Sequence, residues 1–262
     1  MVEIIQFLLV GAFSGFVAGL FGVGGGLILV PFLLFTLHGN VESDYLMHTA
    51  VGTSLGIIIF TSISSVRAHH KHKAIDWGSF KKISPSIVFG SLLGAYITKF
   101  MSFDFMKVFF VIFELIVAAM MLLGIKGKED VKNLSSFVWN GAGTTIGVVS
   151  AIVGIGGGTM TTPFLTYNNV KIKNAIATSA AVGMPIAIAG AIGFMVVGSI
   201  SIGVDNGLGF IHLKSLVIIV LASVTLAPVG AKVAHSLDSQ KLKKLFAVFL
   251  ILLAISVLLF DK

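Results

Sequence analysis

The sequence predicts an all-α polytopic membrane protein, on the strength of its composition and of its apolar runs. The chain has 262 residues, of which 56% are hydrophobic and only 11% charged, whereas a soluble domain is about one quarter charged. The uncharged runs 83–98, 175–204 and 245–260 approach or exceed the roughly 20 residues that a helix needs to cross a bilayer. A soluble core could imitate one such run, but not a series of them.

A third observation is that the second half of the chain repeats the first at a shift of 132 positions. The shift aligns Gly22 with Gly154, Gly24–Gly26 with Gly156–Gly158, and Pro31-Phe32-Leu33 with Pro163-Phe164-Leu165. We therefore predict two membrane repeats, 1–124 and 134–262, joined by a polar cytoplasmic linker at 125–133.

Each repeat begins with an apolar stretch that glycines interrupt, at 4–37 and 134–168, and continues with three apolar runs of helical length. We expect these helices near 46–66, 83–99 and 106–124 in the first repeat and near 174–198, 211–234 and 243–260 in the second. The start of the chain lacks the basic region and the cleavage site of a signal peptide, so we expect it to be retained.

The lysines and arginines decide whether each interrupted stretch crosses the membrane once or doubles back as a hairpin. Single crossings would divide the 18 basic residues 10 inside to 8 outside, whereas hairpins would divide them 14 to 4. Cytoplasmic loops carry the excess of basic residues, so hairpins are favoured. Five segments per repeat then turn the second repeat upside down, which predicts two inverted repeats with both termini outside.

The glycine breaks are the predicted substrate site. Unwound backbone at membrane depth must line protein or a watery cavity, and transporters with inverted repeats place such breaks around a midplane site. New helices starting after each break would direct free N–H groups and a partial positive charge at a small anion. The candidate binding glycines are Gly22, Gly24, Gly25, Gly26, Gly154, Gly156, Gly157 and Gly158.

Two alternatives apply to these glycines. A dinucleotide fingerprint would need a soluble βαβ unit, which the apolar surroundings do not supply. Close packing of membrane helices is the stronger alternative, and it is the role that we expect for Gly11, Gly15 and Gly19.

Hydroxyl pairs follow each hairpin, at Thr53-Ser54 and at Thr178-Ser179. They could donate hydrogen bonds to an anion without adding a buried charge, or they could bond back to their own helices. Because the pair occurs in both repeats, we include these residues in the predicted site.

Few charged residues qualify for a role. Glu114 is the one acid well inside a predicted spanning helix, so it is a candidate for proton or sodium coupling, with a buried structural acid as the alternative. His69, His70 and His72 lie among cations and fit a membrane-surface loop better than a metal site. Arg67, the only arginine, is expected to anchor the interface rather than to contact a departing anion.

The motifs "GxxxGLFGVGGGxxxVPFL" and "GIGGGTxxxPFL", each followed by "AxxTS", resemble the sulfite exporter TauE/SafE family over essentially the whole chain. The resemblance implies a plasma-membrane permease for small sulfur-containing anions such as sulfite, sulfoacetate and other sulfonates. It carries the glycine motifs to 22–26 and 154–158 and the Thr-Ser pairs to 53–54 and 178–179. One departure is Ala151, which stands where Gly19 stands in the first copy.

These observations predict an alternating-access transporter of small anions, with an anion channel or a carboxylate carrier as alternatives. Its expected partners are the anion, the lipid bilayer and a coupling proton or sodium ion. No catalytic constellation, metal site, cofactor or nucleic-acid partner is expected. The basic excess of the chain is explained by its cytoplasmic loops.

Overall fold

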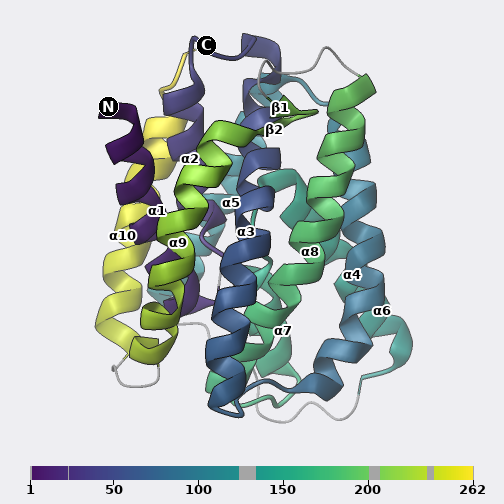
Figure 1. Ribbon diagram of the computed structural model, residues 1–262. Coiled ribbons are helices and arrows are strands. Elements are labelled where there is room, and N and C mark those ends of the chain that lie inside the picture. The colour runs from purple at the N-terminus through teal and green to yellow at the C-terminus, as the bar shows by residue number, and fades with distance from the viewer. Residues whose placement is uncertain (1, 23, 124–133, 201–206, 235–238, 262) are drawn as a thin grey trace.

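The computed structural model describes residues 2–22, 24–123, 134–200, 207–234 and 239–261, and this part of the chain is almost entirely helical (Figure 1). The predicted linker at 125–133 lies outside these residues. The first half contains α1 (Val2–Phe21), α2 (Gly26–Leu37), a short 3-10 turn (Ser43–Tyr45), α3 (Leu46–Lys71), α4 (Trp77–Thr98) and α5 (Phe103–Leu123). The second contains α6 (Ser136–Val153), α7 (Gly158–Tyr167), α8 (Ile172–Ile200), α9 (Leu213–Ala234) and α10 (Ser239–Leu258), with a small hairpin of β1 (Gly207–Leu208) and β2 (Ile211–His212) before α9.

Six helices of the described residues are long and apolar enough to cross a membrane, which confirms the predicted class of a multi-pass membrane protein. They lie within Glu3–Phe21, Ser43–Lys71, Phe103–Leu123, Ser136–Val153, Ile172–Ile200 and Leu213–Val233. The helices α2 and α7 are shorter, at 12 and 10 residues, so either alone would cover less than the roughly 30 Å of a hydrocarbon core.

Both glycine-interrupted stretches double back as helical hairpins. In the first, the rings of Phe7 in α1 and Phe32 in α2 pack edge to face with their centroids 6.1 Å apart. In the second, Trp139 in α6 and Phe164 in α7 form the same kind of contact at 5.1 Å. These two pairs are themselves related by the 132-residue shift, so the hairpins are closed by corresponding aromatic contacts.

Polar contacts show which helix ends lie together. Lys214 at the start of α9 pairs with Glu3 of α1 at 2.8 Å, and Lys107 near the start of α5 donates to the Phe260 carbonyl at 3.1 Å. We call this the terminal end, because both chain termini lie there in Figure 1. At the opposite end, the ammonium of Lys82 in α4 lies over the Trp139 ring of α6.

The most extensive contacts between helices join one half of the chain to the other. α1 packs mainly on α9, and α6 packs mainly on α4. The sequence shift makes α1 the counterpart of α6, and α9 the counterpart of α4, so the two pairings correspond. α3 and α8, which are counterparts as well, pack on each other in the middle of the molecule. This is the set of pairings that an inverted repeat predicts, although the inversion itself stays a prediction.

The α1–α9 contact depends on the glycines for which packing was expected. A Cβ atom at Gly11, Gly15 or Gly19 would approach a backbone oxygen of α9 too closely, at Ile219, Ser223 and Ala227 respectively. The glycines of α1 and the backbone oxygens of α9 that they face both recur every fourth residue, so one glycine stripe of α1 lies directly on the backbone of α9. Small residues allow membrane helices to pack this closely.

Candidate substrate site at the glycine breaks

The breaks use backbone conformations that favour glycine. Positive φ angles occur at Gly22 (68°), Gly24 (79°), Gly25 (82°), Gly154 (79°) and Gly157 (70°). Left-handed backbone costs other residues roughly 1–2 kcal/mol, which explains why glycine occupies these positions of the breaks. α2 and α7 begin immediately afterwards, and neither start is capped by a side-chain hydrogen bond.

The two breaks touch each other. A Cβ atom on Gly24 would lie 2.9 Å from the Cα atom of Gly156, and one on Gly26 would lie 2.8 Å from the Cα atom of Ile155. The structure therefore brings together the glycine motifs of the two repeats, which are more than one hundred residues apart in the chain. Their close backbone contact is the central feature of the candidate site.

Each serine of the Thr-Ser pairs lies against the break of the other repeat. Ser54 Oγ donates to the Gly154 carbonyl at 2.8 Å, and Ser179 Oγ lies 2.9 Å from where a Gly22 Cβ would be. Ser179 donates to the Ile176 carbonyl at 2.8 Å and accepts from Thr162 at 2.9 Å. The Ser54 proton is thus directed at a carbonyl of the opposite break and the Ser179 proton at a carbonyl of its own helix, so in this conformation neither hydroxyl presents its proton to an anion.

Each threonine of the pairs accepts a hydrogen bond from the backbone just before a long helix. Thr53 Oγ1 accepts from the backbone N–H of His212 before α9, and Thr178 Oγ1 accepts from that of Asp76 before α4, both at 2.8 Å. The sequence reasoning missed both partners. Asp76 was detectable, because aspartate is a preferred residue at the start of a helix. In the structure its carboxylate accepts from the N–H groups of Gly78 and Ser79 as the N-cap of α4.

His212 lies at the start of α9, outside the spanning helix. Its Nδ1 accepts from the Ser215 N–H at 3.4 Å, in the manner of a helix cap, and Nδ1 also lies 3.0 Å from Ser215 Oγ. Burial lowers the pKa of His212, and the positive charge of Lys214 lowers it further, while Glu3 acts in the opposite direction. The neutral ring that can accept this bond is therefore the favoured form.

A narrow cavity adjoins the breaks on the side away from the chain termini. It is lined by small and hydroxyl-bearing residues, namely Ala18, Gly22, Gly24, Thr61, Ser62, Ser65, Ala180 and Gly183. The cavity is too narrow to admit a water molecule. Three of its hydroxyls were not predicted, although Thr61 and Ser65 lie 7 and 11 residues after Ser54 and so share its helix face.

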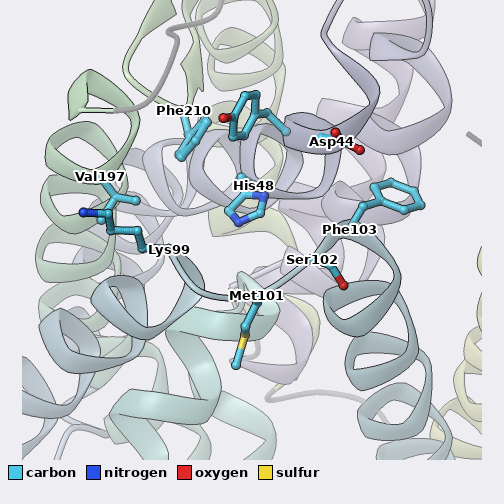
Figure 2. Close-up of a pocket in the computed structure, with 9 residues that line it drawn as sticks. Asp44, His48, Lys99, Met101, Ser102, Phe103, Val197 and Phe210 are labelled. Carbon is cyan, nitrogen blue, oxygen red and sulfur yellow. The ribbon is translucent and has the colours of Figure 1, made fainter.

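A second cavity of about 280 Å³ lies at the terminal end (Figure 2). Asp44, Tyr45, His48, Lys99, Met101, Ser102, Phe103, Val197 and Phe210 line it. The His48 ring lies in the middle of these side chains, and its Nε2 donates to the Thr98 carbonyl at 2.9 Å. The lining of this cavity therefore includes an acidic residue, Asp44, and a basic residue, Lys99, near the start of α3, the helix that carries Thr53 and Ser54.

Glu114 lies apart from the breaks, on α5. Its side chain is 0% exposed, and neither carboxylate oxygen has a hydrogen-bond partner among the described residues. It lines neither of the cavities above. An ionised carboxylate without a partner at membrane depth is costly, so this position accommodates the uncharged acid.

The described residues hold no group of three His, Asp or Glu side chains that could bind a metal ion. His69, one of the three histidines considered for such a site, is fully buried in the last turns of α3, whereas His70 and His72 are exposed.

Comparison with known proteins identifies the family of the chain. The chain is 37% identical over 255 residues to a "Probable membrane transporter protein" of Haemophilus influenzae, covering 96% of this chain and 97% of the relative. A "Probable membrane transporter protein" of Methanocaldococcus jannaschii is 28% identical, over 96% of this chain and 94% of its own length. No solved structure matches. The sulfite exporter TauE/SafE family matches residues 7–257, and the chain belongs to that family of membrane transporters.

Proposed function

We propose that this transporter moves small anions, most readily sulfite, sulfoacetate or other sulfonates, by alternating access around the two glycine breaks. One observation carries the proposal: α2 and α7 both start, without side-chain caps, where Gly24 and Gly156 meet. The family name points to sulfite, and the exposed apolar helices are consistent with a place in the cell membrane.

Helix starts suit such a substrate. The first N–H groups of a helix have no partner within it, and the helix dipole adds roughly half a positive charge at that end. Two starts directed at one point would attract an anion without any buried lysine or arginine. Binding by such dipoles alone is weaker than binding by full charges, which favours the release that a carrier needs.

The structure corresponds to a closed form of the proposed site. The breaks are in contact and the adjoining cavity is too narrow for water, so an anion can enter only when the breaks separate. The bond from Ser54 to the Gly154 carbonyl joins the two halves at this point. We infer that opening exchanges this bond for contacts to the anion, which would return the predicted donor role to Ser54.

The proposal is tested with purified protein in liposomes. We expect saturable uptake and counterflow of labelled sulfite or sulfoacetate, weaker transport of acetate and succinate, and no flux in empty liposomes. Flux that stays linear with substrate and carries large unitary currents would instead show an anion channel. Preference for the carboxylates would overturn the substrate class while leaving the carrier mechanism intact.

We further propose that Glu114 carries the proton that couples transport. Its buried carboxylate, which has no partner among the described residues, can be uncharged in one state and ionised in another that exposes it. Glu114→Gln keeps the shape but cannot ionise, so we expect transport of unchanged substrate affinity that no longer responds to a pH gradient. An unchanged response to the pH gradient would show that Glu114 is structural, and a response to a sodium gradient alone would assign the coupling to that ion.

A further inference from the structure

A groove of about 480 Å³ lies between α3 and α9, away from the glycine breaks and toward the end opposite the termini. From α3 it is lined by Phe60, Ile63, Ser64, Arg67, Ala68 and Lys71, together with His72; from α9 it is lined by Val224, Pro228 and Lys232. The α3 residues recur every third or fourth position and those of α9 every fourth. Each set therefore forms one face of its helix.

The groove changes from apolar to basic along its length. Both helices start at the terminal end, since the Thr53 hydroxyl near the start of α3 accepts from His212, which precedes α9. Along α3 the lining changes from Phe60 to Arg67 and Lys71, and along α9 it changes from Val224 to Lys232. Among the described residues, no acidic side chain lines the groove. Its shape and charge therefore match an amphiphile with an apolar chain and an anionic head.

A proline in α9 leaves a carbonyl free to bond with α3 across the groove. Pro228 has no N–H group, so the Val224 carbonyl four residues earlier lacks its helical donor. Ser64 Oγ on α3 donates to this carbonyl at 2.8 Å. The walls of the groove are thus held together at one depth, while Arg67 and Lys232 beyond it remain exposed.

We propose that this groove binds an anionic phospholipid, with its phosphate held by Arg67, Lys71 and Lys232 and an acyl chain along Phe60, Val224 and Pro228. The guanidinium group matches phosphate geometry with two parallel N–H donors. The basic residues of the chain favour the cytoplasmic side for this end, and anionic lipids are found in that leaflet. The assignment is independent of the transported substrate.

The test measures lipid binding to the detergent-purified protein by native mass spectrometry, with phosphatidylglycerol and phosphatidylcholine as probes. We expect the wild type to retain phosphatidylglycerol in preference, and the double variant Arg67→Gln with Lys232→Gln to bind it about 25-fold more weakly, at about fivefold for each charge removed. Lys81→Gln is the matched control, because Lys81 is an exposed basic residue of α4, the next helix in the chain after α3, and does not line the groove.

Three outcomes would overturn the proposal. Equal retention of phosphatidylcholine would show that the basic residues are ordinary interfacial anchors. An equal loss in Lys81→Gln would show that the attraction is diffuse. Displacement of the lipid by millimolar sulfite or inorganic phosphate would show that the groove takes free anions. Because binding is measured without flux, none of these outcomes bears on whether the protein transports sulfite.

Discussion

Gly24→Ala should strongly reduce transport. A Cβ atom at this position would lie 2.9 Å from Gly156 Cα and 3.2 Å from Ile58 Cγ2, so the two breaks would have to move apart. Overpacking of this kind costs about 1–3 kcal/mol, and the left-handed backbone adds about 1–2 kcal/mol. If that cost falls on the closed form, sulfite counterflow should drop roughly tenfold or more.

Gly39→Ala separates the two causes. Gly39 has a nearly identical φ of 81°, but nothing lies within 4 Å of where its Cβ would be. This variant carries the backbone cost without the contact, so its counterflow should stay within about twofold of wild type. If the two variants transport equally well, contact between the breaks is not essential to transport.

Gly15→Ala should destabilise the whole protein rather than impair transport selectively. Its Cβ would lie 2.6 Å from the Cα atom of Ser223 and 2.8 Å from the carbonyl carbon of that residue, and helix backbone cannot yield as a flexible side chain can. We expect the apparent melting temperature in detergent to fall by roughly 5–10 °C. Yield and monodispersity should fall with it.

The matched control for Gly15 is Gly141→Ala in α6. Gly141 is helical, and nothing lies within 4 Å of its would-be Cβ. Alanine there should stabilise the helix by about 0.5–1 kcal/mol, because it loses less conformational entropy than glycine on folding. A melting temperature for Gly15→Ala equal to that of Gly141→Ala would contradict the packing role of the α1 stripe.

The hairpins were predictable because two independent patterns agree on them. The glycine runs placed the breaks, and α2 and α7 indeed begin within them, at Gly26 and Gly158. The basic residues then required each stretch to double back, as the Phe7–Phe32 and Trp139–Phe164 contacts show. Composition and length sufficed for the class of protein, because every spanning helix must meet the same demand of the lipid.

The hydrogen bonds of the candidate site were not predictable in the same way. Ser54 lies one hundred residues from Gly154, and Thr53 is 159 residues from His212. Hydropathy and motif spacing describe a chain locally, whereas these bonds depend on which helices of the two halves pack together. The prediction named Thr53 and Ser54 as candidate site residues, but it could not show that their hydroxyls already have protein partners.

The pairing of α1 with α9 also constrains how the protein can be made. α1 is synthesised before α9, so the backbone that its glycine stripe contacts is made only after the helices from α2 to α8. Until then α1 has no close-packed partner for that face. In the same way, α4 lacks its main packing partner until α6 has been synthesised. Neither repeat can therefore complete its packing alone, and the two halves of the chain reach their final packing together.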